Sequence, residues 1–205
     1  MVITIGREYG SGGKYIGEQL AKRLQMSFYD KEIIQRLSKE KNIDEKLLES
    51  MDEKHKNSFW YTLAMSAMSF EDSVNSLTDL PTEDKYFIET SKMIEEISQE
   101  NNSIIIGRCA NVILRNKPDT LHIFLYASDI NFKINRKIEF AGMSEQKAKK
   151  AIEKIDKQRA SYYAYYTEEK WGAKEGYDVL IDTAKLGIEG TIALIENIAK
   201  KLSNR

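Results

Sequence analysis

Short, almost continuously apolar segments alternate along the chain with stretches whose apolar residues recur every three or four positions. The apolar segments predict buried strands at 2–5, 26–29, 103–106, 121–126 and 179–181. The three-to-four spacing predicts helices between the strands and at the end of the chain, among them 83–101 and 188–202. This alternation favours an α/β fold with a five-stranded parallel sheet and helices on both faces. In such sheets, ligands bind at the carboxyl ends of the strands.

One long stretch, residues 31–101, carries almost no strand signal, and its spacing predicts several helices. Within it, residues 59–70 are rich in aromatic side chains and methionine at helical spacing. Such a stripe is typical of a packed core, and an adaptable pocket is the alternative.

Glycines are concentrated directly after the first predicted strand, between Gly6 and Lys14. Glycine lets the backbone turn its N–H groups inward, and the following helix offers free N–H donors and the positive end of its dipole. A tight turn without a ligand is the alternative. The glycines, serine and lysine within residues 10–14 favour a phosphate-binding loop.

The loop departs from the usual phosphate-loop pattern of glycine, four residues, glycine, lysine and then serine or threonine. If Lys14 is the phosphate lysine, the leading glycine falls on Glu8 and the hydroxyl residue on Tyr15. If residues 10–12 form the core of the loop, Gly13 takes the lysine position and Lys14 the hydroxyl position. An anion-binding backbone is therefore predicted without the point charge and the metal-binding hydroxyl in their usual places.

Composition narrows the class of protein. The chain has 205 residues, of which 41% are hydrophobic and 31% charged, enough for one core with a small inserted subdomain. Its net charge of −1 gives no overall attraction to nucleic acid or membrane, so neither is expected as a partner. No apolar run approaches the length of a membrane span, and the first segment is a strand. One cysteine excludes an internal disulfide, and a cytoplasmic location is predicted. His55 and His122 are far apart, so no metal cluster is expected.

Charged residues follow other predicted strands. Asp30 follows the second strand, and Arg108 follows the third strand and a glycine, where a guanidinium could reach a phosphate or carboxylate across the crevice. An ordinary surface ion pair is the alternative for Arg108. The segment 128–170 is dense in basic residues, including Arg136 and Arg159, and a solvated helical face is the alternative there.

Aromatic residues follow in the same basic segment. Tyrosines at 162, 163, 165 and 166 either stack on a base or pack a helix against the sheet or the partner subunit of a homodimer.

Five motifs resemble the cytidylate kinase-like family of bacterial proteins, within the nucleoside monophosphate kinases. They are R-E-Y-G-S-G-G (7–13), F-Y-D-K-E (28–32), I-I-G-R-C-A (105–110), D-K-Q-R-A-S-Y-Y (156–163) and Y-D-V-L-I-D-T (177–183). The resemblance spans nearly the whole chain. It implies a single P-loop NTPase-type domain with a core at 1–30, 102–127 and 176–205, a helical acceptor-binding insert at 31–101 and a helical lid at 128–175.

The resemblance also implies site residues. The phosphates of ATP, used with Mg²⁺, would be held by Gly10, Ser11, Gly12, Gly13, Lys14 and Tyr15. A nucleoside monophosphate or another small phosphorylated acceptor would be bound by Asp30, Arg108 and Arg7. The catalytic residues would be Lys14, Arg136, Asp156 and Arg159, with the lid bringing its arginines to the transferring phosphate.

The chain departs from cytidylate kinase at Gly13, where the lysine belongs, and at Ile152, where the lid would carry another arginine. Lost charge at such positions commonly costs several powers of ten in rate. Lys14, Arg7 or Lys154 are the candidates to compensate. Two functions therefore stay open: a phosphotransferase that moves the γ-phosphoryl group of ATP to a nucleoside monophosphate or another small phosphate acceptor, and a nucleotide-sensing protein of the same fold that has lost catalysis.

Overall fold

The computed structural model describes residues 1–41 and 82–203. The aromatic segment 59–70 and His55 lie outside the described residues. The chain divides into two compact units, one formed by Met1–Asp30 with Ile94–Arg205 and the other by Lys31–Met93. The second unit contains α2 (Glu32–Lys41) and the first part of α5 (Thr82–Glu100), which continues across the boundary.

The first unit is built on a parallel sheet of five strands in the order β2-β3-β1-β4-β5. Their bounds are Val2–Arg7 for β1, Ser27–Tyr29 for β2, Ser103–Ile106 for β3, Thr120–Tyr126 for β4 and Val179–Asp182 for β5. All five strands were predicted from apolar runs, and the predicted parallel sheet is confirmed. Because β1 lies between β3 and β4, the segments that follow these strands meet at one edge of the sheet.

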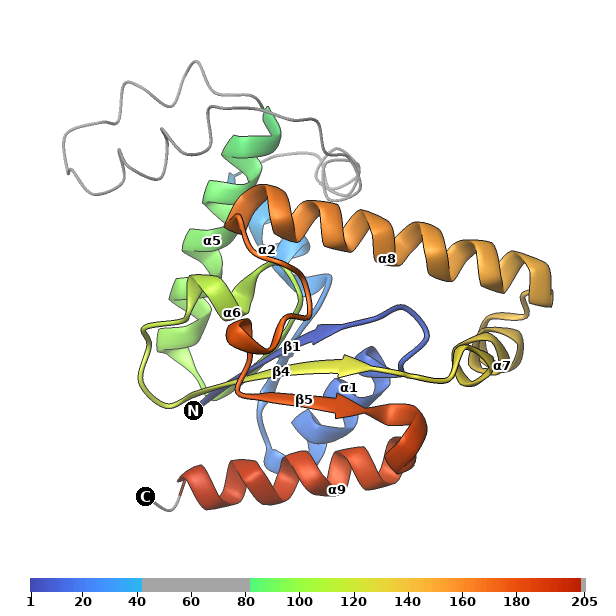
Figure 1. The fold of residues 1–205 in the computed structure, drawn as a ribbon. Helices are drawn as coiled ribbons and strands as arrows, with labels where there is room; N and C mark the ends of the chain where they lie inside the picture. Colours follow the sequence, from blue (N-terminus) through green and yellow to red (C-terminus); the bar gives the residue numbers. More distant parts are fainter. Residues whose placement is uncertain (42–81, 204–205) are drawn as a thin grey trace. The chain divides into compact units, whose positions relative to one another are not determined.

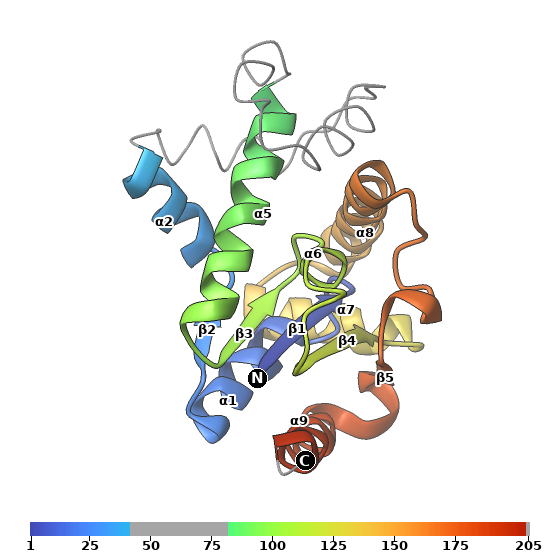
Figure 2. The same cartoon turned by 90° about the vertical axis from the view of Figure 1, so that its left-hand side faces the viewer.

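Helices cover both faces of this sheet, as Figures 1 and 2 show. On one face lie α1 (Gly13–Leu24) and α9 (Thr183–Ser203), and on the other lie α6 (Ala110–Ile113) and α8 (Glu145–Thr167). The helix α7 (Ile130–Ala141) lies beyond the carboxyl end of β4, and a 3₁₀ turn at Lys174–Gly176 precedes β5. No helix in the described part of the chain is long and apolar enough to cross a membrane.

The main core lies between the sheet and the pair α1 and α9. Its buried side chains come from the middle of each long strand and from one face of each helix. They include Ile3, Ile5, Ile104, Ile123, Ile16, Leu20, Ile192 and Ile195. Burying such side chains is worth roughly 1.5–3 kcal/mol each, which fixes the strand ends that carry the polar residues of the site.

The structure differs from the prediction at three elements: the end of β1, the short helix α6 and the start of the last helix. The strand β1 continues through Gly6 to Arg7, because Gly6 pairs with Phe124 and Arg7 with Leu125 on β4. A side chain at Gly6 would begin 2.9 Å from the Phe124 ring, so the glycine allows β1 to pass this ring. The short α6 carries too few residues to show a period. The last helix begins at Thr183 and contains a non-helical residue at Gly187, after which the predicted segment follows.

The helices α7 and α8 form a pair with a small core of their own. Asp129 caps α7 by accepting a hydrogen bond from the backbone N–H of Asn131, and Ser144 caps α8 by accepting one from that of Lys147. Ile152 is buried between the two helices with Ile134 and Ala148, and Tyr9 packs on this cluster. The residue at the position of an expected lid arginine is therefore part of a hydrophobic core.

Candidate phosphate-binding site

The glycine loop connects β1 to α1 and has the geometry of an anion site. Gly10 and Gly12 both have a φ of +90°, which L side chains rarely adopt. The helix α1 begins at Gly13, with Gly12 as its N-cap. Since glycine has no side chain to cap the first turn, the N–H groups at the start of α1 are available to a bound anion.

Three cations of α7 and α8 gather around this loop. The Lys137 ammonium lies 3.7 Å from the centroid of the Tyr9 ring, and the Arg159 guanidinium lies 5.8 Å from the same centroid. The Arg136 guanidinium is 3.4 Å from the place where a side chain at Gly12 would begin. Burial lowers the pKa of Lys137, and the positive charges of Arg159 and Arg136 lower it further. Like charges collected at an N–H-rich loop favour a bound anion.

A charged network joins the same helices to the loop. Lys133, only 8% exposed, donates a hydrogen bond of 3.0 Å to the Glu8 carboxylate and lies 3.7 Å from that of Asp156. Asp156 accepts a hydrogen bond of 2.6 Å from the backbone N–H of Tyr9. Glu8 also accepts one from the backbone N–H of Ala127, at the end of β4. Burial raises the pKa of Asp156, and the Tyr9 N–H and Lys133 oppose this rise.

A second group of charges lies where β1, β2 and β3 end. The two oxygens of the Asp30 carboxylate face different cations: Arg7 Nη2 at 3.5 Å from Oδ1 and Lys14 Nζ at 3.2 Å from Oδ2. Arg108 Nε donates a hydrogen bond of 3.4 Å to the backbone oxygen of Asp30. The structure thus brings four of the predicted residues together beside the glycine loop.

The backbone that presents Arg108 is unusual. Gly107, Arg108 and Cys109 all have left-handed φ values, of +73°, +56° and +56°. Two of these residues carry side chains, and such conformations cost free energy that the surrounding structure must supply. The turn directs the chain from the end of β3 into α6 and leaves the Arg108 guanidinium beside the end of β2.

The remaining predicted residues take different places. Arg159 donates a hydrogen bond of 2.9 Å to the backbone oxygen of Arg7, which brings α8 to the end of β1. The Ser11 hydroxyl donates to the backbone oxygen of Glu8 and so fixes the turn of the loop. Tyr15 lies on the first turn of α1 with 45% of its surface exposed.

Tyr163 and Tyr166 are buried, which confirms the packing interpretation for these two residues. Tyr163 stacks on Tyr177, with 6.5 Å between the ring centroids.

Sequence reasoning did not single out three residues of the site, Glu8, Tyr9 and Lys133, whereas Lys137 stands beside Arg136 in the base-rich segment that it did recognise. Glu8 and Tyr9 fall inside the R-E-Y-G-S-G-G motif but are neither glycine nor lysine. Lys133 and Lys137 are spaced i,i+4 on α7, so they share one face of the helix. This spacing within a base-rich segment is the signal that points to them, although it does not indicate their partners.

The donor set does not fit a magnesium ion held by the protein in the usual way. Lys14 stands at the position of the metal-binding hydroxyl and faces Asp30. Among the described residues, no group of three acidic, histidine or cysteine side chains is placed to hold a metal. His122 is buried with its Nδ1 2.8 Å from the Thr4 hydroxyl, which is a satisfied structural role.

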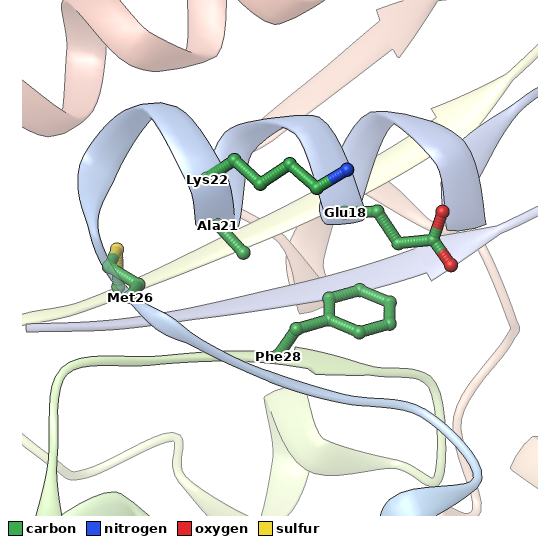
Figure 3. Close-up of a pocket in the computed structure, with 5 residues that line it drawn as sticks. All are labelled: Glu18, Ala21, Lys22, Met26 and Phe28. Atoms are coloured by element: carbon green, nitrogen blue, oxygen red, sulfur yellow. The ribbon is translucent and has the colours of Figure 1, made fainter.

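A surface depression of about 300 Å³ lies away from these residues, between α1 and β2 (Figure 3). It is lined by Glu18, Ala21, Lys22, Met26 and Phe28. None of the predicted site residues contributes to it, so it is separate from the glycine loop.

The sheet order and the glycine loop between β1 and α1 define a P-loop fold of the kinase type. Comparison with known families agrees, with residues 2–185 matching the family described as cytidylate kinase-like. The chain belongs to the cytidylate kinase-like family.

Solved structures share the fold. An uncharacterized protein from Eubacterium ventriosum is 24% identical with a TM-score of 0.71, and the match covers 98% of each chain. Shikimate kinase from Bacteroides thetaiotaomicron is 11% identical with a TM-score of 0.52, again over 98% of each chain. No match was found among curated protein sequences. At these identities the similarity establishes the fold alone, and the reaction has to be inferred from the residues of the site.

Proposed function

We propose that this protein is a phosphotransferase that moves the γ-phosphoryl group of ATP to a nucleoside monophosphate or a related small phosphorylated acceptor. The observation that carries the proposal is the gathering of Arg136, Lys137 and Arg159 at the N–H-rich start of α1. A transferring phosphoryl group spreads negative charge over its oxygens, and fixed cations around it lower the barrier.

The donor phosphates would lie on the backbone N–H groups of residues 10–14, next to Tyr15, with Lys14 at the edge of the loop. An acceptor oxygen attacks the γ-phosphorus, the bond from this phosphorus to the bridging oxygen breaks, and ADP leaves. Arg136 and Arg159 would stabilise the charge on the transferring group. Family membership makes ATP with Mg²⁺ the expected donor in general terms, and we derive no step through the ion because the donor set described above does not hold it.

The acceptor would be gripped at the ends of β2 and β3. Arg108 offers a planar guanidinium that can bind two phosphate oxygens at once. Asp30 holds Arg7, Lys14 and, through its backbone oxygen, Arg108. That residues 31–101 form an acceptor-binding insert stays an expectation from the family resemblance.

Asp156 would act by positioning. It binds the Tyr9 N–H and faces Lys133, so it holds α8 against the loop and places Arg159, three residues further on, at the end of β1. This gives the D-K-Q-R motif a physical role without a contact between Asp156 and the phosphates.

A nucleotide-sensing protein of the same fold is the second candidate. The presence of Gly13 at the lysine position and Lys14 at the hydroxyl position favours it, because these residues usually contribute to rate. In that case the loop would bind nucleotide and the pair α7 and α8 would move, without transfer.

The test is an ADP-release assay with Mg²⁺ and ATP across CMP, dCMP, UMP, AMP and small phosphorylated metabolites, beside calorimetric titration with ATP. Acceptor-dependent ADP release that falls about 100-fold in Arg136→Ala supports the proposal. Lys157→Ala, which removes an exposed cation from α8, is the matched control. ATP binding without ADP release from any acceptor would assign the sensing function, and absence of both would refute the two functions together.

A further inference from the structure

Two positions of the phosphate loop are exchanged relative to the usual pattern. With Gly12 as the second glycine, the leading glycine of the pattern falls five residues earlier, on Arg7, and the lysine falls on Gly13. A basic residue therefore stands where a glycine is usual, and a glycine stands where the basic residue is usual. The chain has one cation at these two positions, as the usual loop has.

The structure places these two residues against each other. A side chain at Gly13 would begin 2.7 Å from Arg7 Cβ and 2.8 Å from Arg7 Cγ. Distances below 3.0 Å are not tolerated between such atoms, so the stem of Arg7 occupies the space from which a lysine at residue 13 would start. The presence of arginine at residue 7 accounts for glycine at residue 13.

A second glycine accommodates the head of the same side chain. A side chain at Gly107, in the turn after β3, would overlap Arg7 Nη1. The Arg7 side chain thus runs from the start of α1 to the end of β3, between two glycines. Its Nη2 lies 3.5 Å from Asp30 Oδ1.

We propose that Arg7 supplies the phosphate-binding charge of this loop, from the end of β1 in place of the first turn of α1. The inference rests on the proposed binding of ATP at the loop. Arg7 would bind the terminal donor phosphate from the side of β3, where Arg108 would bind the acceptor. The sequence left Lys14, Arg7 and Lys154 open as candidates to compensate for the missing lysine and placed Arg7 with the acceptor, and this proposal assigns Arg7 to the donor.

Lys14 is less suited to this role. It is more exposed than Arg7, with 55% of its side chain accessible against 19%, and its ammonium lies between Asp30 and Glu18. The Arg7 guanidinium presents a planar fork of donors, which can contact a phosphate and the Asp30 carboxylate at the same time.

The experiment measures ATP affinity by calorimetry, and kcat/KM where transfer is detected, on five full-length variants, one of which is Arg7→Gly as the reference for the double variant. Arg7→Ala should weaken ATP binding by about tenfold or more and lower kcat/KM about 100-fold. Gly13→Lys alone should lower the melting temperature, because its side chain collides with Arg7. In an Arg7→Gly background the same Gly13→Lys change should raise ATP affinity, because the double variant returns to the usual pattern. Arg23→Ala is the control, since Arg23 lies on α1 and pairs with Glu189 at the surface.

The outcomes separate this inference from the proposed function. A wild-type protein that binds ATP while Arg7→Ala binds it equally tightly would overturn the role of Arg7 and leave the phosphotransferase proposal standing. A wild-type protein that binds no ATP would overturn the proposed function, and this inference with it. Where Arg7→Ala lowers the melting temperature strongly, Arg7→Gln replaces it, because glutamine keeps most of the length and removes the charge.

Discussion

At the scale of single residues, glycines and basic side chains are paired throughout the candidate site. A side chain added at any of four glycines would meet a basic residue. The pairs are Gly10 with Lys133, Gly12 with Arg136, Gly13 with Arg7 and Gly107 with Arg7. The glycines therefore do more than allow left-handed turns, because they also let cations from β1 and α7 lie directly against the loop backbone. This arrangement concentrates positive charge without a lysine at residue 13.

Arg108 allows a test of the acceptor side. Arg108→Ala should raise the KM for the acceptor, or lower kcat/KM by about 100-fold, because it removes a charged contact to the acceptor phosphate. ATP affinity should stay near the wild-type value, since the loop is unchanged. Initial-rate kinetics with varied acceptor, beside calorimetry with ATP, measure both quantities, with Arg23→Ala as the control. An equal loss of ATP affinity would place Arg108 on the donor side.

At the scale of elements, hydrophobic pattern predicted the three central strands β1, β3 and β4 because they are buried on both faces, so their apolar runs are almost unbroken. The edge strands β2 and β5 are less buried and were predicted from shorter apolar runs. The same rule ended β1 too early at Ile5, because Gly6 and Arg7 are not apolar and only their pairing with β4 keeps them in the sheet. The helix α6 was missed for a related reason, since four residues after three left-handed ones carry no periodic signal.

The contacts of the site were harder to predict than its elements. Arg136, Asp156 and Arg159 were recognised from a base-rich segment and a family motif. Their partners were not, because the link from Glu8 to Lys133 joins residues 125 positions apart. Only the packing of α7 and α8 at the carboxyl ends of the strands brings such residues together. Tyr9 was missed for the same reason, because only this packing places the Lys137 and Arg159 side chains over its ring.

The lid at 128–160 stays a prediction that can be tested through α7 and α8. We expect its backbone amides to exchange hydrogen faster than those of β1, β3 and β4 without nucleotide, because a catalytic lid must open to admit substrates. Ion pairs of Lys133 with Glu8 and Asp156 join α7 and α8 to the loop. Hydrogen exchange with and without ATP measures the difference. Equal protection of lid and sheet in both conditions would contradict the expected motion.

Arg159 allows a test of whether the expected lid contributes to the rate of phosphoryl transfer. Arg159→Ala should reduce the single-turnover rate by two orders of magnitude or more, on the scale of about 3 kcal/mol for a transition-state charge contact. ATP binding should change far less, because the N–H groups of the loop remain. Lys157→Ala, on the same helix, is the control. Equal losses in rate and in ATP affinity would show that Arg159 binds the ground state.

At the scale of the whole molecule, a polar network that is buried at Asn111 and Tyr163 and reaches the surface at Arg115 ties the last turns of α8 to α6. Asn111 on α6 donates hydrogen bonds of 2.8 Å to the Tyr163 hydroxyl and 3.0 Å to the backbone oxygen of Gly176. Arg115 forms two hydrogen bonds with Glu169, and Tyr163 donates to the same carboxylate. The middle of α8 reaches the phosphate loop through Asp156 and Arg159, while its last turns are anchored by this network.

The buried tyrosine hydroxyls at this anchor are expected to limit the stability of the fold at alkaline pH. Burial raises the pKa of Tyr163 to about 12, while the unfolded chain releases the same proton near pH 10. The stability that this neutral phenol contributes is therefore complete below about pH 10 and is lost as the pH rises towards 12. Burial raises the pKa of Tyr177 as well, so the ionisation of either phenol lowers the stability of the folded protein at alkaline pH.

Tyr163→Phe should consequently lower the free energy of unfolding at pH 8 by about 1 kcal/mol, because Asn111 loses one hydrogen-bond partner. Between pH 10 and 12 its stability should fall less steeply than that of the wild type, because one buried phenol no longer has to ionise. Urea unfolding at a series of pH values measures both effects, and Tyr177→Phe provides a second variant in which the same flattening is expected. Wild-type and Tyr163→Phe curves that run parallel from pH 8 to pH 12 would show that the phenol of Tyr163 does not set the alkaline limit.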